Sequence, residues 1–314
     1  MFPYSNMPYG FPPPVCYPLT ECCMYLLFIL CFLHAWKKGV GKVAYLLGGL
    51  GFGLLLEYVN VMSSAGYKYG QFMIMLGHAP DNIPVWIGAG WGVIIYTSRL
   101  ISDSRGLSIW AAAAFDSLLA LSIDLSMDVV AYRLHMWHWD WQGMHSPELA
   151  LTGQWFGIPY GNFFGWLCVV FFYSLFARFL EKVSKTNIWR AVTPLFSILI
   201  SQVVLWLMLF PISDWLKLKF NIVSKEKLIF LLVLFPIMSI IGFRKRKDIP
   251  STNIPFITWL VPAWFHLYFF CWLFMGGFST ENKWMTFWCV VNLLTGIAIH
   301  WWLHLRKPKL ISEL

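Results

Sequence analysis

Residues 107–131 read LSIWAAAAFDSLLALSIDLSMDVVA, an apolar run long enough to cross a lipid bilayer that also carries Asp116, Asp124 and Asp128. A second apolar run, residues 43–62, carries Glu57. A charged side chain at the centre of a bilayer costs about 2.5 to 3.5 kcal/mol on insertion scales, so such residues usually face the protein interior and function there. These four acids are therefore the first candidates for a functional site.

The composition predicts an integral membrane protein. Charged residues make up 12% of the 314-residue chain, against about 25% in soluble domains, and apolar residues reach 59%. The formal net charge of +8 is compatible with nucleic-acid binding, but the Lys and Arg residues form short clusters between apolar runs, as loops beside anionic lipid do. We therefore expect membrane lipid as a partner and no nucleic acid.

A window of about 20 residues, enough to cross a hydrocarbon core of about 30 Å, gives nine candidate spans. The predicted fold class is all-α, a single polytopic helix bundle of eight or nine spans over residues 1–314. The first span is expected to be retained, because the Pro- and Tyr-rich residues 1–18 lack the basic residues of a cleavable signal. The spans are residues 19–36, 43–62, 83–96, 107–131, 160–180, 191–215, 228–243, 254–278 and 285–305.

Positive charge predicts the orientation of the bundle. With the N-terminus outside and the C-terminus inside, most of the 23 Lys and Arg residues fall in cytoplasmic loops, which satisfies the positive-inside rule. The Lys-rich loop at residues 211–227 is the exception. We expect this orientation in a bacterial or archaeal cytoplasmic membrane.

The predicted topology brings polar groups from several spans to one depth near the outer face. Asp124 and Asp128 are four residues apart, which is about 6 Å along a helix and on the same helix face. Glu57 lies in the outer third of its span, and the third and fifth spans begin at that face with polar and aromatic residues. We expect a polar pocket there, with Asp116 two turns deeper and bonded to donors on a neighbouring helix.

Several of these residues allow two interpretations. Arg133 is either a snorkelling residue at the membrane interface or a partner of Asp128. The three tryptophans at positions 137, 139 and 141 are best interpreted as an aromatic belt at the membrane interface. The second interpretation is a wall around an apolar substrate. The acids themselves can serve packing by accepting hydrogen bonds from neighbouring helices.

Eight histidines suggest an alternative, a membrane di-iron hydroxylase or desaturase acting on a lipid. His135 with His138 and His300 with His304 have spacings that place two imidazoles on one helix face, as a metal site requires. The predicted topology puts these two pairs on opposite sides of the membrane, so we assign no metal site. The seven Cys form no C-x-x-C pair, and we assign them no disulfide.

The most specific sequence feature is the stretch WFGIPYGNFFGW at residues 155–166. Together with Glu57, the segment from Gly66 to Gly70, Asn82 to Pro84 and residues 128–139, it resembles the carotenoid biosynthesis membrane-protein family that includes the CruF-type carotenoid 1,2-hydratases. The resemblance covers about residues 45–245. It implies hydration of the terminal double bond of an acyclic carotenoid or another isoprenoid, giving a tertiary alcohol without a change in redox state.

The candidate residues suit this chemistry, which needs a proton donor, stabilisation of a tertiary cation and one positioned water. Neighbouring carboxyls in a low dielectric keep a proton available, and each aromatic face stabilises a cation by about 0.5 to 2 kcal/mol. No metal, nucleotide or flavin is needed, so we expect no cofactor. We assign Glu57, Asp124 and Asp128 as catalytic. The candidate substrate- or water-binding residues are Tyr67, Asn82, Arg133, Tyr160, Asn162, Phe163 and Trp166.

Two functions outside enzymology stay open at this point. An isoprenoid or lipid transporter also places acids in its spans, but it favours broken helices and pseudo-symmetric halves. An assembly protein for a pigment or lipid enzyme complex would need none of the acids for activity.

Overall fold

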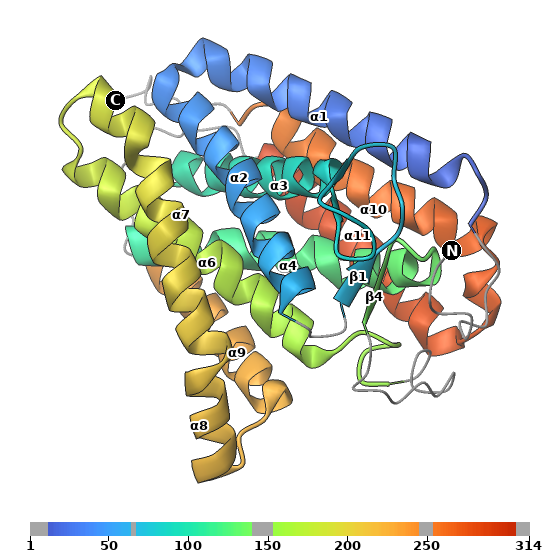
Figure 1. Ribbon diagram of the computed structural model, residues 1–314. Coiled ribbons are helices and arrows are strands. Elements are labelled where there is room, and N and C mark those ends of the chain that lie inside the picture. Colours follow the sequence, from blue (N-terminus) through green and yellow to red (C-terminus); the bar gives the residue numbers. More distant parts are fainter. Residues whose placement is uncertain (1–11, 64–66, 140–152, 245–253, 306–314) are drawn as a thin grey trace.

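The chain folds into a bundle of long helices with short strands at one end (Figure 1). The computed structural model describes residues 12–63, 67–139, 153–244 and 254–305. Within these residues eight helices are long and apolar enough to cross a membrane, which confirms the predicted all-α membrane bundle. The helices are α1 (Cys16–Lys38), α2 (Val40–Met62), α3 (Val85–Ser104), α4 (Ile109–Arg133), α6 (Tyr160–Val183), α7 (Asn187–Leu209), α8 (Pro211–Phe220), α9 (Ser224–Arg244), α10 (Ile257–Met275) and α11 (Lys283–Leu305).

The sequence predicted nine spans, and the third of them, residues 83–96, corresponds to α3, which is not among these eight helices. It continues past the predicted end at residue 96 to Ser104, and the added turns include Arg99 and Asp103. With these charged residues and the glycines of its first half, α3 lies outside the set of eight apolar helices. Because α3 packs among α1, α2, α4 and α10, its side chains are mostly buried and need no lipid-facing surface.

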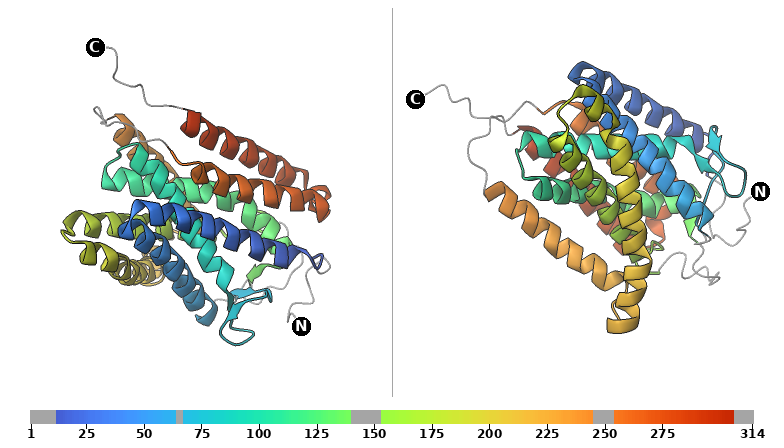
Figure 2. Two further views of the ribbon diagram at one scale, coloured as in Figure 1. Left: turned by 90° about the horizontal axis from the view of Figure 1, so that it is seen from above. Right: turned by 60° about the vertical axis from the view of Figure 1, so that its left-hand side comes forward.

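The predicted sixth span, residues 191–215, is divided in the structure. Helix α7 ends at Leu209, and α8 begins at Pro211 after a non-helical Phe210 (φ −112°, ψ −87°). Proline has no backbone N–H and is favoured in the first turn of a helix, so a break directly before Pro211 is expected. Helix α8 projects beyond the rest of the bundle (Figures 1 and 2).

Glycines allow α2 and α3 to pack closely. A Cβ atom at Gly49 would lie 3.2 Å from the Cα atom of Gly92, and one at Gly53 would lie 2.5 Å from the side chain of Trp91. Small residues at such spacings let two membrane helices approach backbone to backbone. The contact places the Trp91 ring against α2, one turn before Glu57.

Two short strand pairs cover the end of the bundle where α2 and α4 finish and α3 and α6 begin. Strand β1 (Tyr67–Tyr69) pairs antiparallel with β4 (Trp137–Trp139), so that Tyr67 lies opposite Trp139. Strand β2 (Met75–Leu76) pairs with β3 (Ile83–Pro84). The aromatic side chains of β1 and β4 thereby cover part of the bundle interior at this end.

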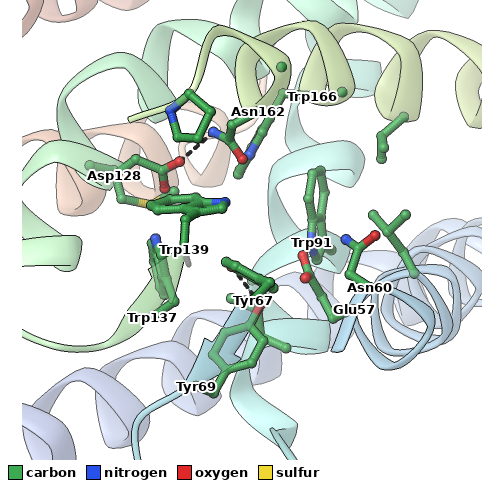
Figure 3. A pocket seen from close by; sticks show the side chains of 18 of the residues that line it. Glu57, Asn60, Tyr67, Tyr69, Trp91, Asp128, Trp137, Trp139, Asn162 and Trp166 are labelled. Atoms are coloured by element: carbon green, nitrogen blue, oxygen red, sulfur yellow. Dashed lines mark hydrogen bonds between the residues drawn. The ribbon is translucent and has the colours of Figure 1, made fainter. Parts of the chain in front are cut away.

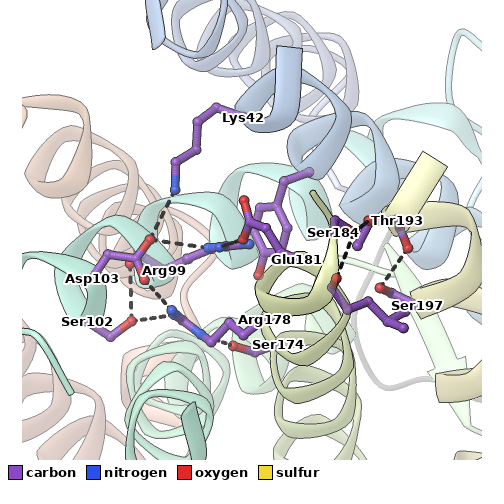
Figure 4. Close-up of polar contacts among 12 residues, drawn as sticks. Lys42, Arg99, Ser102, Asp103, Ser174, Arg178, Glu181, Ser184, Thr193 and Ser197 are labelled. Atoms are coloured by element: carbon purple, nitrogen blue, oxygen red, sulfur yellow. Dashed lines mark hydrogen bonds and ion pairs between the residues drawn. The ribbon is translucent and has the colours of Figure 1, made fainter. Parts of the chain in front are cut away.

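Ion pairs connect the helices at the opposite end (Figure 4). Arg178 of α6 donates to Asp116 of α4 over 2.7 Å and to the Ser102 hydroxyl of α3 over 2.6 Å. Arg99 pairs with Glu181 and lies over the Tyr45 ring, 4.2 Å from its centroid. Asp116 is thus bonded to neighbouring helices, as expected, and it lies outside the candidate pocket.

Candidate functional site

A cavity of about 390 Å³ lies beneath the β1–β4 pair, among α2, α3, α4 and α6 (Figure 3). Its wall is mostly apolar with a few polar groups, and its volume falls in the lower part of the range of about 300–1,000 Å³ for small-molecule pockets. The polar lining residues are Glu57, Asn60, Tyr67, Tyr69, Asp128 and Asn162, and the tryptophans are Trp86, Trp91, Trp137, Trp139 and Trp166.

A bridged pair of carboxyls forms one wall. Helix α4 places Asp124 and Asp128 one turn apart, with exposures of 0% and 2%. The Asn162 amide nitrogen of α6 donates to both, over 3.1 Å to Asp124 Oδ2 and 2.5 Å to Asp128 Oδ2. Asp128 lines the cavity, whereas Asp124 does not and joins the site through Asn162. Two buried carboxyls served by one amide repel each other when both are charged, so the pair can hold a proton between them.

Glu57 forms the opposite wall (Figure 3). The Trp91 indole N–H donates to Glu57 Oε1 over 2.9 Å, which fixes the orientation of the carboxyl group. The other oxygen, Oε2, is buried and has no hydrogen-bond partner among the described residues. Because a buried carboxylate oxygen without a partner is costly, this atom is the natural acceptor for a water or a substrate hydroxyl.

Two tyrosines of β1 lie between these walls (Figure 3). The Tyr67 hydroxyl donates to the Tyr69 hydroxyl over 3.1 Å. Burial raises the pKa of both phenols well above the ordinary value. Both hydroxyls therefore stay protonated at any physiological pH and are able to donate hydrogen bonds into the site.

The stretch at residues 155–166 builds the start of α6. Gly157 has φ +95°, a left-handed conformation that favours glycine, and allows the tight turn in which Trp155 and Ile158 pair. The Gln154 side chain accepts from the Tyr160 backbone N–H over 2.6 Å and so caps the first turn of α6. The helix then presents Asn162 and, one turn later, Trp166 to the cavity.

The cavity brings together some of the predicted site residues and leaves out others. Glu57, Tyr67, Asp128, Asn162 and Trp166 line it. Three further predicted binding residues do not line it and have other contacts: Asn82 exchanges two hydrogen bonds of 3.0 Å with Gln71, Tyr160 donates to the Gln154 carbonyl, and Phe163 packs edge-on against Trp155.

Arg133 does not line the cavity either, and it is neither a snorkelling residue nor a partner of Asp128. Its guanidinium is fully buried and forms a two-point ion pair with Glu281, with both N–O distances at 2.7 Å. It also donates to the Phe156 carbonyl over 2.9 Å. Arg133 therefore joins α4 to the α10–α11 connection and to the turn before α6, a contact between distant segments that no sequence pattern indicates.

The structure also adds lining residues that the sequence-based prediction missed. Asn60 follows Glu57 by three residues and Tyr69 follows Tyr67 by two, so helix and strand periodicity were available signals for both. Trp86 and Trp91 lie in an apolar span with no such signal. Trp137 and Trp139 line the cavity, which supports their reading as a wall around an apolar substrate, whereas Trp141 lies outside the described residues.

Within the described residues, His138 and His300, one from each predicted histidine pair, lie in different parts of the fold. His138 lies in β4 and stacks on Tyr132, whereas His300 lies about 25 Å along α11 from the start of that helix. Among the described residues no group of three or more His, Cys, Asp or Glu side chains is arranged to hold a metal ion. The side chain of His304 lies outside the described residues.

A model of the carotenoid biosynthesis protein family matches residues 20–223, more than half of the chain. The chain belongs to this family. The matched region contains every lining residue of the cavity except Phe265, so the candidate site lies within the part shared with carotenoid biosynthesis proteins. Comparisons with curated proteins and with solved structures gave no match.

Proposed function

We propose that this carotenoid biosynthesis protein adds water to the terminal double bond of an acyclic carotenoid or a related isoprenoid. The observation that supports this most is the carboxyl pair bridged by Asn162, which faces Glu57 across an aromatic cavity. The family supports a role in carotenoid biosynthesis. The two separated acidic groups support the assignment to hydration, because this reaction requires an acid on one side of a cation and a base for water on the other.

The Asp124–Asp128 pair donates a proton to the less substituted carbon of the alkene, and a tertiary cation forms at the other carbon. The faces of Trp139 and Trp166 stabilise this cation by about 0.5 to 2 kcal/mol each. Glu57 accepts a proton from a water as the oxygen of that water bonds to the cation. The product is a tertiary alcohol, and the cycle closes when the proton on Glu57 returns to the carboxyl pair.

The replacements Asp128→Asn and Glu57→Gln test this assignment, because each keeps the size of the side chain and removes its capacity to transfer a proton. We expect each variant to insert normally and to lose most of its turnover, measured as isoprenoid that gains the mass of one water. Asp214→Asn, an exposed acid in α8, is the matched control and keeps full activity. Full product formation by both site variants at normal abundance would contradict the mechanism.

A second experiment tests cofactor independence. Purified protein in detergent is expected to hydrate its polyene after exhaustive chelation, without oxygen and without NAD(P)H. Strict dependence on iron and oxygen would instead favour the di-iron alternative. A transporter or assembly protein would give no product in either condition, and an assembly role would not require Asp128.

A further inference from the structure

The cavity has a rim of partly exposed residues on one side. These residues are Asn60 of α2, Gly161 and Gly165 of α6, Leu209 of α7 and Phe210 after it. Phe210 is 43% exposed, whereas the lining residues of the far wall, such as Ile94 and Met127, are at most 4% exposed. The cavity therefore opens between α2, α6 and the end of α7.

Glycines keep this opening wide on the α6 side. A Cβ atom added at Gly165 would meet nothing within 4 Å, and one added at Gly161 would meet only Ser224, at 3.4 Å. The two glycines are four residues apart and so lie on the same face of α6. A side chain at position 165 would therefore begin in open space beside the opening.

The surface on the α2 and α7 sides of the opening is apolar, whereas the polar start of α9 adjoins it at Gly161. Trp206 and Leu207 of α7 and Val59 of α2, which flank the rim, are 57%, 40% and 41% exposed. In a membrane bundle such a surface faces hydrocarbon, because in water it would form an unfavourable apolar patch. At the end of the bundle, strands β1 and β4 cover the cavity, and the tilted rings of Tyr67 and Trp139 have their centroids 5.3 Å apart.

The size of the cavity limits what it encloses. Its volume of about 390 Å³ lies in the lower part of the range of about 300–1,000 Å³ that encloses drug-sized molecules. A long polyene chain is larger than such a molecule. Such a chain therefore fits only with one end in the cavity and the rest outside, through the opening.

We propose that this opening is a lateral entrance through which one end of a long isoprenoid chain passes from the bilayer into the cavity, while the remainder stays in lipid against α2, α6 and α7. Gly165 determines whether the chain can enter. The identity of the chain rests on the proposed function, whereas the entrance rests on the geometry alone. The entrance also explains how an apolar end group reaches buried acids without crossing water.

The first test measures what lies at the entrance and needs no turnover. A nitroxide spin label is attached at Gly165→Cys, in a protein without its native cysteines and in lipid vesicles. We expect collisions with oxygen, which dissolves in the bilayer, to exceed collisions with a water-soluble nickel chelate. Leu207→Cys on the lipid-facing side of α7 gives the same pattern, and Lys185→Cys in the α6–α7 loop gives the reverse. Greater collision with the nickel chelate at position 165 would overturn the proposal.

The second test compares side chains of increasing size at position 165. Gly165→Ala adds an atom into open space and keeps near-normal activity, whereas Gly165→Leu narrows the entrance and lowers kcat/KM by about tenfold. Leu33→Trp adds bulk on the exposed surface of α1, which contributes no residue to the cavity lining, and leaves kcat/KM unchanged. Wild-type kcat/KM in Gly165→Leu would overturn the entrance. A wild-type protein without hydratase activity, but with oxygen-dominated collisions at position 165, would contradict the proposed function and leave the entrance standing.

Discussion

At the scale of single residues, the site depends on how its few polar atoms are oriented. Among the described residues, Trp91 donates to Glu57, and Asn162 donates to Asp124 and Asp128. Such donors matter in an apolar cavity, because a hydrogen bond to a charged group contributes about 1.5 to 3 kcal/mol and few waters compete for it. Trp91 is therefore a positioning residue that acts through Glu57.

Replacing Trp91 by Phe tests this role, because Phe keeps an aromatic face and removes the indole N–H. We expect kcat to fall by about tenfold, because Glu57 no longer holds the water in one orientation. The KM for the isoprenoid should change little, since the apolar wall remains. Trp110→Phe, at a residue of α4 that is 60% exposed, is the control for general effects of removing a tryptophan. Equal kcat values in the two variants would show that Trp91 only fills space.

At the scale of helices, two kinds of contact hold the site in place. Glycines bring α2 and α3 together at the level of the cavity, and ion pairs join α3, α4 and α6 at the other end of the bundle (Figure 4). The ion pairs are not part of the proposed chemistry. Their role is to fix the rotation and depth of α4 and α6, and thereby the meeting of Asp128 with Asn162.

Asp116→Asn tests the structural role of this network. Arg178 and Asp116 have side chains that are 8% and 1% exposed, so removing the charge of Asp116 weakens a buried contact and leaves Arg178 paired with Asp103. We expect a loss of about 1.5 to 3 kcal/mol in stability, seen as a lower melting temperature in detergent. The control is Lys42→Gln, which removes a pair with Asp103 whose side chains are 27% and 33% exposed and is expected to change stability by less than about 1 kcal/mol. Similar melting temperatures for the two variants would contradict this interpretation.

At the scale of the whole molecule, the cavity lies at one end of the bundle, so its orientation decides which side of the membrane it adjoins. The start of α11 lies at the same end as the cavity, and the α6–α7 loop lies at the other end (Figures 1 and 2). The distribution of Lys and Arg predicts that the cavity end is outside. That orientation places the reaction in the outer half of the bilayer.

Cysteine labelling tests the orientation in a protein without its seven native cysteines. A membrane-impermeant maleimide should label Lys283→Cys, at the start of α11, in intact cells. It should label Lys185→Cys, in the α6–α7 loop, only after permeabilisation. Labelling of position 185 in intact cells would reverse the predicted topology and leave the geometry of the cavity unchanged.

The sequence alone determined that this protein is a membrane helix bundle, where most spans lie, and that Glu57 and Asp128 are candidate site residues. It could do so because a bilayer requires long apolar helices that satisfy their own backbone hydrogen bonds, and because buried acids stand out against them. Tertiary structure decided which neighbours these acids have. Arg133 meets Glu281 and not Asp128, and Trp91 meets Glu57, because the rotation and separation of the helices depend on close packing at glycines. Residues 109–133 are buried on nearly every side, so their sequence carries no periodic pattern that would reveal this rotation.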